Sequence, residues 1–310
     1  MSITRRDLGK LAFAATPAAS LFAKPDSKFR GVQIGAITYS FRALPSTAGD
    51  VVKYCTELGI SSVELMSDVA ESFAGAPAIP RVPGRNATPE QREAAKRATA
   101  ERTKWRTGAP MDKYKALRAM FSQAGIKIEI FKLAIDPRMN DAECDYVFET
   151  AKALGAHCIT MELPKDPAVS KRAGEFGQRH KIFIGYHNHT QVNEQSWETA
   201  LAQSSYNSIN LDVGHFTEAI SKPPLEFIER NASRITSFHL KDKRFGTNGG
   251  GNRPWGQGDT PLKDVLRLMA KKKYRWPANI ELEYDVPKDS SVMAEMKKCV
   301  AFCKDPIAGG

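Results

Sequence analysis

The stretch GYHNHT, residues 185–190, places His187 and His189 two positions apart at the end of the apolar run KIFIGYHNHT. Side chains two positions apart lie on the same side of a β-strand. A lone histidine at the end of a strand is most often a hydrogen-bonded core or turn residue. The chain has only six histidines, so whether this pair has a chemical role depends on what the other strands carry at their ends.

Four other predicted strands also end in carboxylate or imidazole side chains, at spacings of 25, 25, 27 and 42 residues. Such spacings are typical of successive β/α units, whose strand ends converge near the axis of a closed barrel. Burying this many polar groups without partners would cost on the order of several kcal/mol each, whereas one divalent cation would satisfy them together. The predicted ligands are Glu162, His187, Asp212, His239 and Glu281.

Mixed oxygen and nitrogen ligands suit Mn²⁺, Zn²⁺, Fe²⁺ or Co²⁺, and no nearby cysteine selects for zinc. We expect Mn²⁺ first, with Mg²⁺ also admitted. The sequence leaves open whether Glu162 or His187 is the first ligand. It also leaves open that Asp212 only caps the next helix and that His239 is a satisfied core imidazole.

The elements that would position these residues alternate regularly. Three segments read as a helix end, a glycine C-cap and a β-branched strand: 56–66, 122–133 and 152–163. Further strands are predicted at 32–41, 181–189, 207–215, 234–242 and 278–285, with helices such as 223–231 and 261–273 between them. Eight strands alternating with helices predict an α/β fold, a single-domain (β/α)8 TIM barrel over 24–310. An open doubly wound sheet would need a glycine-rich phosphate loop after the first strand, and the sequence has none there.

One connection is overlong, since residues 70–112 form a polar insertion after the second strand. Thr88 and Gln91 match a capping box, with Pro89 at the first helical position. The helix that follows has little apolar face, so we expect it to project from the mouth of the barrel. It would serve as a lid or as an assembly contact, and homo-oligomerisation is left open.

Residues 1–23 contain Arg5 and Arg6 followed by a short apolar run, the pattern of a twin-arginine export signal. This predicts the twin-arginine export machinery as a partner and a periplasmic or extracytoplasmic location. A membrane-retained anchor is the alternative. The five cysteines show no CxxC spacing, and we expect free, buried thiols rather than disulfides.

The composition is that of a globular protein, 42% hydrophobic and 26% charged. The net charge is +10, and much of the excess lies between residues 81 and 115. Such a basic stretch can bind nucleic acid. Here Glu90, Glu93 and Glu101 interrupt it and it contains only two aromatic residues, Trp105 and Tyr114, so a solvated helix face is the better interpretation.

The motifs LDVGHF, FHLKD and YRWPANIELE resemble those of the xylose isomerase-like TIM-barrel superfamily, which holds sugar isomerases and epimerases, inosose dehydratase-like enzymes and apurinic endonucleases. The resemblance covers nearly all of the chain after residue 23. In ketose epimerases of this group a Glu, an Asp, a His and a Glu hold one metal ion. The last three match Asp212, His239 and Glu281, and the family's substrate-binding histidine matches His215.

The first family ligand, a glutamate, falls at His187 in this chain. One carboxylate of the family's two-glutamate proton shuttle is therefore absent from that strand, and Glu162 becomes a replacement ligand or base. The resemblance also implies that trinuclear apurinic endonucleases need an Asp-x-His between strands seven and eight. Residues 249–259 contain no histidine and lack the paired aspartate, so we expect no nucleic-acid partner.

These observations lead to a metal-dependent sugar isomerase or epimerase with a small-molecule carbohydrate substrate. The cation would bind the carbonyl and a vicinal hydroxyl and stabilise an enediolate, while Glu281 or Glu162 removes the C–H proton. The alternatives are a lyase or hydrolase that acts on 3-oxo-glycosides by β-elimination, and a sugar-binding barrel without turnover.

Further side chains near the strand ends are candidates for contact with substrate. Lys241 would polarise or anchor substrate oxygens in catalysis, unless it and Arg244 are ordinary surface cations. The remaining predicted substrate contacts are His189, His215, Arg244, Trp255, Gln257 and Glu64.

Overall fold

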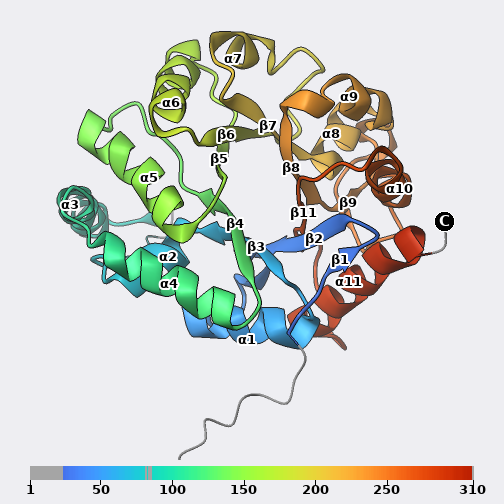
Figure 1. Ribbon diagram of the computed structural model, residues 1–310, viewed down its shortest axis with the longest axis horizontal. Helices are drawn as coiled ribbons and strands as arrows, with labels where there is room; N and C mark the ends of the chain where they lie inside the picture. The colour runs from blue at the N-terminus through green and yellow to red at the C-terminus, as the bar shows by residue number, and fades with distance from the viewer. Residues whose placement is uncertain (1–23, 81, 83–85, 309–310) are drawn as a thin grey trace, which may run out of the picture.

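The structure is a computed structural model that describes residues 24–80, 82 and 86–308. Eight parallel strands close around a central axis, with helices outside them (Figure 1). The predicted single-domain (β/α)8 barrel is confirmed, because β11 pairs with both β8 and β2 and β2 pairs with β3. The barrel strands are β2 (Val32–Ile37), β3 (Ser62–Met66), β4 (Lys127–Lys132), β5 (Cys158–Glu162), β6 (Phe183–His187), β7 (Asn207–Asp212), β8 (Ile235–Leu240) and β11 (Ala278–Ile280).

Two short pairings flank the barrel: β1 (Lys28–Phe29) is antiparallel to β2, and β9 (Asp242–Lys243) is antiparallel to β10 (Asn252–Arg253). Two of the predicted glycine caps, Gly59 and Gly155, have left-handed backbone (φ 71° and 77°) directly after a helix. The helices are α1 (Ala48–Leu58), α2 (Ser67–Ala74), α3 (Pro89–Arg106), α4 (Met111–Gln123), α5 (Asp141–Leu154), α6 (Pro167–His180), α7 (Glu198–Gln203), α8 (Val213–Ile220), α9 (Leu225–Arg230), α10 (Leu262–Lys272) and α11 (Val292–Ala308).

The first and last barrel strands are shorter than the sequence predicts. Residues 38–41 form the 3-10 helix η2 (Thr38–Phe41), and β11 ends at Ile280. Beyond Ile280, a side chain takes the place of the backbone hydrogen bonds between the two strands. Ser40 Oγ donates to the carbonyl of Ile280 (3.0 Å) and accepts from the amide of Leu282 (3.0 Å). Glu281 therefore lies just beyond the last strand rather than within it.

The inside of the barrel is unusually polar. Glu64, Thr160, Asn210 and Asn279 are all fully buried. Each makes at least one hydrogen bond, as most buried polar side chains do: Thr160 Oγ1 donates to Glu64 (2.6 Å), and Asn279 Nδ2 also donates to it (3.2 Å). Gly35 makes room for this layer, because a Cβ there would lie 2.2 Å from Asn279 Oδ1. The apolar core lies mainly between the barrel and its helices.

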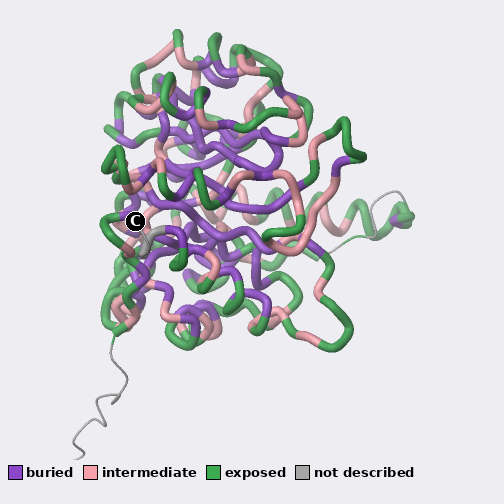
Figure 2. The backbone as a smooth tube through the Cα atoms, turned by 90° about the vertical axis from the view of Figure 1, so that its right-hand side faces the viewer, coloured by how far each residue is buried: buried purple, intermediate pink, exposed green. Residues whose placement is uncertain are grey.

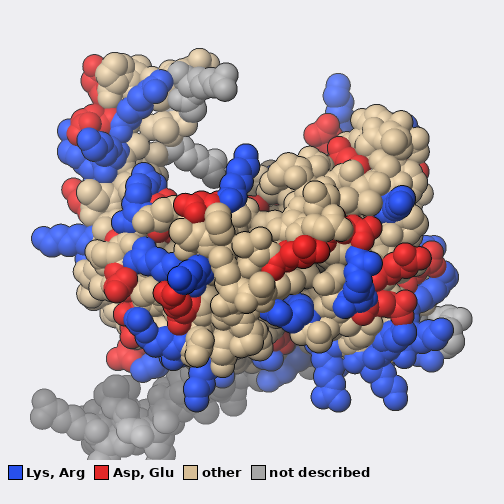
Figure 3. Space-filling model, turned by 90° about the horizontal axis from the view of Figure 1, so that it is seen from above, with Lys and Arg blue, Asp and Glu red and all other residues tan. Residues whose placement is uncertain are grey.

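Three helices, α2, α3 and α4, lie between β3 and β4, where a regular barrel has one. α3 has the predicted capping box of Thr88 and Gln91 with Pro89 at its start, and none of its residues is buried. It stands out from the body of the molecule (Figures 2 and 3). Its last turns are anchored through Arg102 and Arg106.

The anchor of α3 is a buried carboxylate on α2. Glu71, whose side chain is 1% exposed, accepts from Arg106 Nε (2.7 Å) and from the hydroxyl of Tyr146 (3.0 Å). Arg102 approaches the same carboxylate at 3.5 Å and donates to the carbonyl of Pro77. A carboxylate shared by two guanidinium groups holds the base of the projecting segment against the barrel.

The cysteines within the described residues are free and buried, as the sequence predicts. Among the helices of the described residues, none is both long enough and apolar enough to cross a bilayer. The predicted export signal at residues 1–23 lies outside the described residues, so export stays a prediction.

Replacing Glu71 by alanine leaves Arg102 and Arg106 half-buried without their counter-ion. We expect Glu71→Ala to lower the free energy of unfolding by about 3 kcal/mol, because removal of one partner strands the other charges. Urea titration followed by tryptophan fluorescence measures this loss. Asp112→Ala, which removes an exposed carboxylate paired with Lys115, is the control and should change little; equal effects would show that the anchor is not specific.

Candidate metal centre and active site

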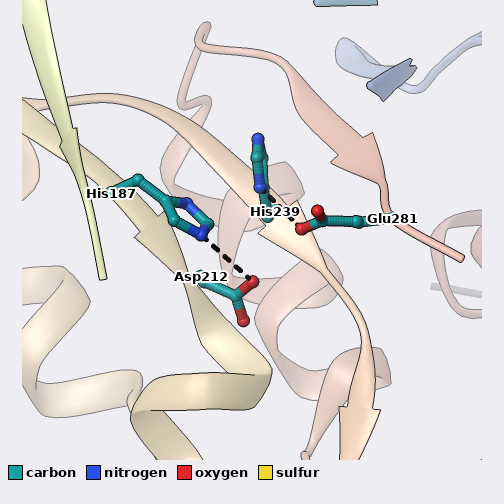
Figure 4. Close-up of side chains that lie close together, drawn as sticks. All are labelled: His187, Asp212, His239 and Glu281. Atoms are coloured by element: carbon teal, nitrogen blue, oxygen red, sulfur yellow. Dashed lines mark hydrogen bonds and ion pairs between the residues drawn. The ribbon is translucent and has the colours of Figure 1, made fainter. Parts of the chain in front are cut away.

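Four side chains from neighbouring strands point to one spot inside the barrel (Figure 4). His187 ends β6, Asp212 ends β7, His239 belongs to β8, and Glu281 directly follows β11. One ligand atom from each residue lies within 4.8 Å of those of the other three, and all four side chains are buried. The register explains the convergence, because Asp212 lies opposite His239 on the adjacent strand. These four residues are called the cluster below.

His187 is held in one orientation by its neighbour on β7. Its Nδ1 lies 2.8 Å from Asn210 Oδ1, and since an amide oxygen can only accept, Nδ1 carries the proton. Nε2 is then a free lone pair, 4.0 Å from Asp212 Oδ2. Burial and the nearby cationic groups of His239 and Lys132 keep the pKa of His187 well below its usual value. The ring is therefore neutral, as a metal ligand must be.

The two carboxylate oxygens of Asp212 make different contacts. Oδ1 accepts from the amide of His215 (2.7 Å) and caps α8. Oδ2 is buried without a hydrogen bond, although Lys241 Nζ lies 2.9 Å away in poor hydrogen-bonding geometry. Gly214 permits the tight approach of α8, because a Cβ there would lie 2.5 Å from Lys241 Cγ. Asp212 thus caps a helix and still offers one oxygen to the cluster.

His239 lies between two carboxylates. Its Nδ1 is 2.8 Å from Glu281 Oε2, and its Nε2 is 2.7 Å from Glu64 Oε2. Burial alone would lower the pKa of His239, but the two carboxylates outweigh it and raise the pKa to about 10. Glu64, predicted to contact substrate, lies beneath His239 with no exposed surface. Its contacts are those of a group that orients the imidazole, as carboxylates behind metal-bound histidines do.

Lys241 is the second cation of this region, and it is as buried as the cluster. Its Nζ contacts Asp212 (2.9 Å), Glu281 (3.0 Å) and Glu283. Burial would lower the pKa of Lys241, but these carboxylates together raise it. Likewise burial would raise the pKa of Glu281, and Lys241 and His239 instead keep it well below its usual value. Glu281 is therefore ionised.

The cluster fits a divalent cation by two criteria. The unprotonated Nε2 of His187 and Asp212 Oδ2, an oxygen without a hydrogen bond, lie 4.0 Å apart inside the barrel. In addition, the carboxylates of Glu64, Asp212, Glu281 and Glu283 outnumber the cations Lys241 and His239 by two. A mixed nitrogen and oxygen donor set of this kind could hold one first-row divalent ion.

Glu162 lies at the rim and is not one of the cluster. Its side chain is 53% exposed and pairs with His189 Nε2 (3.0 Å) and Lys132 (3.2 Å). With His187 and His189 it forms a second, partly exposed group of possible ligands. The hydrogen bond to Glu162 raises the pKa of His189, so this rim histidine is well suited to carry a proton.

His215 lies against the same space, with its ring 4.8 Å from that of His189. Neither ring nitrogen of His215 has a hydrogen-bond partner, although both are buried. Burial and the charges of Lys241 and Lys243 lower its pKa to about 3. A neutral, buried imidazole with two unsatisfied nitrogens is a ready contact for a substrate hydroxyl.

The predicted contacts of the glycine-rich loop lie farther out. Arg244 and Gln257 are exposed, and Trp255 packs edge-on against Phe302 of α11 (5.5 Å). Within the described part of the chain, no hydrogen bond or ion pair joins these three to the cluster.

Sequence reasoning did not single out Asn210 or Glu283 as site residues. The sequence pattern could have indicated both, because Asn210 lies two positions before Asp212 and Glu283 lies two positions after Glu281. Side chains two positions apart lie on the same side of an extended chain. Asn210 fixes the tautomer of His187, and Glu283 shares Lys241 with the cluster.

Comparison with known proteins supports the family and the fold. A family model described as "Xylose isomerase-like TIM barrel" matches residues 52–301. No curated protein matches the sequence at a significant level.

Several solved structures share the fold at low sequence identity. The probable 3-DHS dehydratase AsbF of Bacillus anthracis is 15% identical, with a TM-score of 0.62 over 86% of this chain and 98% of its own. The D-psicose 3-epimerase of Clostridium cellulolyticum H10, solved with D-tagatose, is 10% identical, with a TM-score of 0.59 over 89% and 99%. The 3-keto-D-glucoside 4-epimerase YcjR of E. coli is 10% identical, with a TM-score of 0.58 over 88% and 99%.

Glu64 should control metal affinity without touching the metal. We expect Glu64→Gln to raise the dissociation constant for Mn²⁺ by about 10- to 100-fold, because it removes the charge that orients His239. Isothermal titration calorimetry on metal-stripped protein measures the change. Glu129→Gln, in a carboxylate that pairs with Lys127 and His157 instead, is the matched control and should bind as wild type does.

Metal binding should release a proton from His239. Since its pKa is about 10, the ring is protonated at neutral pH, and a metal at Nδ1 must displace that proton. Raising the pH makes displacement easier, so affinity should increase about tenfold per unit between pH 6.5 and 8.5. Titration calorimetry in buffers of different ionisation enthalpy should count about one released proton. Affinity that is independent of pH would contradict this assignment.

Proposed function

Since this chain belongs to the xylose isomerase-like TIM-barrel family, we propose that it is a divalent-metal-dependent sugar isomerase or epimerase. The observation that carries the proposal is the buried convergence of His187, Asp212, His239 and Glu281 beside a carboxylate and histidines that are free to act on a substrate. The similar solved structures of a 3-keto-D-glucoside 4-epimerase and a D-psicose 3-epimerase support the choice of substrate class. Bound at the cluster, a divalent cation would polarise a sugar carbonyl and make the adjacent C–H more acidic.

Glu281 is the proposed base. Its contacts with His239 and Lys241 are all made through Oε2, which leaves Oε1 for the proton of a substrate carbon. The low pKa of Glu281 keeps it ionised, and its burial beside two cations holds it in one place. A carboxylate positioned in this way can act as a general base in a site from which water is excluded.

His189 and Glu162 are the proposed proton donor pair at the rim. His189 is held by Glu162 (3.0 Å), and the bond raises its pKa. A protonated imidazole on the outer side of the substrate can return a proton to the neighbouring carbon or oxygen after Glu281 has removed one. Separate acid and base groups allow the configuration to invert or the carbonyl to move, the two outcomes of epimerisation and isomerisation.

His215 and Lys241 are proposed to hold the substrate oxygens. The unpartnered nitrogens of His215 can each take one hydrogen bond from or to a hydroxyl. The Lys241 ammonium group donates to Glu283 and lies beside Glu281, so its charge would stabilise the negative charge that develops on the substrate oxygen when the proton leaves.

A second candidate is a lyase that acts on 3-oxo-glycosides by β-elimination. This reaction needs one base, and the interior of the site offers Glu281 for that role. The strand β6 ends in His187 rather than in a carboxylate, and Glu162 lies at the rim. In this reaction Glu281 removes the proton next to the carbonyl, the C–O bond at the β carbon breaks, and His189 protonates the departing oxygen. The twin-arginine segment supports an extracytoplasmic role in either case, and that location is part of the proposal.

Solvent exchange tests the proposal. Mn²⁺-loaded protein in D₂O, given a panel of ketoses and a 3-keto-glucoside, should place deuterium next to the carbonyl. Glu281→Gln should slow this exchange by about 10³-fold, because it removes the base, while Glu129→Gln should leave it unchanged. Release of the aglycone with an unsaturated product would identify the lyase. Absence of both exchange and cleavage, with sugar still bound, would contradict catalysis and leave a sugar-binding barrel.

A further inference from the structure

A cavity of about 1310 Å³ opens at the end of the barrel opposite the cluster. Its wall includes the first residues of three strands, Lys127 of β4, Phe183 of β6 and Ile235 of β8. The cluster, by contrast, includes the last residues of β6 and β7. The cluster and this cavity are therefore separated by the length of the barrel, and the proposed function uses none of the residues that line the cavity, called the basal cavity below.

The basal cavity is strongly cationic. Glu129 is the one carboxylate among the residues that line it, against eight Lys and Arg residues: Lys28, Arg30, Lys127, Arg234, Arg267, Lys271, Lys273 and Arg275. Lysine and arginine side chains also crowd the lower edge of the molecule in Figure 3, opposite the projecting α3. Cations gathered around a concave wall reinforce each other's field and attract anions.

Several of these charges have no anion of their own. Lys127 pairs with Glu129 and Arg267 with Asp264, each at 2.9 Å. Within the described residues, Lys271, Lys273 and Arg275 form no ion pair. Arg234 donates to three backbone carbonyls, of Leu201, Ser204 and Asn207, but to no carboxylate. Three carbonyl groups fix the guanidinium group of Arg234 in place but do not neutralise its positive charge.

Aromatic and hydroxyl groups accompany the cations. Phe183 is 40% exposed, one of the few large apolar side chains at the described surface. Trp276 stacks on Tyr274 (4.3 Å between ring centroids), and its Nε1 is buried without an acceptor. Apolar ring faces with a few convergent donors are the usual lining of a site for an organic ligand. The cavity therefore matches a ligand with hydroxyls and flat C–H faces as well as negative charge.

We propose that the basal cavity binds an anionic oligosaccharide, with Lys271, Lys273 and Arg275 on its acidic groups and Phe183 and Trp276 against its rings. The volume exceeds that of most small-molecule sites, so it admits several sugar units. The proposal does not rest on the function of the cluster, and either can fail alone.

The experiment uses the full chain and an oligogalacturonide of four units, whose carboxylates are matched by the neutral, fully methyl-esterified form. Binding is followed by tryptophan fluorescence and by calorimetry. The variant Lys271→Gln, Lys273→Gln, Arg275→Gln should weaken binding at least tenfold, and the methyl ester should bind at least tenfold more weakly to wild type. The control is Lys53→Gln, Lys96→Gln, Arg97→Gln, which removes the same charge from exposed sites on α1 and α3 and should bind within twofold of wild type.

Three results would overturn the proposal. Equal losses in the two triple variants would mean that only the net charge matters. Equal binding of the methyl ester would exclude anion recognition. Tighter binding of a single-stranded DNA oligomer or of vesicles with anionic headgroups would assign the cavity to another class of partner.

Phe183→Ser should weaken binding of the oligogalacturonide at unchanged salt dependence, because stacking is not screened by ions while charge attraction is. Circular dichroism melting confirms that each variant is folded.

Discussion

Compensation of buried negative charge is the constraint on which the active end of this barrel depends. Four carboxylates meet where water is largely excluded, and isolated buried anions are too costly to persist. The chain supplies two cations of its own, Lys241 Nζ at 2.9–3.0 Å from Asp212 and Glu281, and the imidazolium of His239 between Glu281 and Glu64. What remains uncompensated is about the charge of one divalent ion. The same buried carboxylates that require Lys241 and His239 for the stability of the fold would therefore also attract a catalytic cation.

The polar lining of the barrel follows from this constraint. Glu64 could not lie under His239 without further donors, and Thr160 and Asn279 provide them. Asn210 plays the same part for His187, whose free nitrogen exists because the amide oxygen holds the proton on the other one. His187 is therefore fixed by a residue of the adjacent strand, whereas His239 is fixed by Glu64 from across the barrel. A closed barrel can hold several side chains near one point in this way because all of its strands face the same axis.

The two ends of the barrel differ in sign and in construction. The carboxyl ends of the strands gather carboxylates and histidines in a buried cluster, whereas the amino ends open into a wide cavity lined by cations. The projecting α3 is a third element, anchored at its base by Glu71 and otherwise unburied. Most of the positive net charge therefore lies away from the chemistry, which leaves the cluster free to keep an excess of negative charge.

The sequence by itself determined the barrel and most of its cluster. The glycine-capped helices and the β-branched strands follow from local propensity, a property of neighbouring residues. The intervals of 25, 27 and 42 residues from His187 through Asp212 and His239 to Glu281 follow from the succession of β/α units. The capping box that begins α3 was equally local.

Only the tertiary structure decided the roles of the supporting groups. Glu64 meets His239 across 175 residues, Lys241 turns inward rather than to the surface, and Glu162 stays at the rim although its spacing matches the others. The basal cavity also draws its cations from distant segments. These outcomes depend on strand tilt, side-chain direction and burial, which are fixed when the sheet closes and leave no trace in the spacing of residues along the chain.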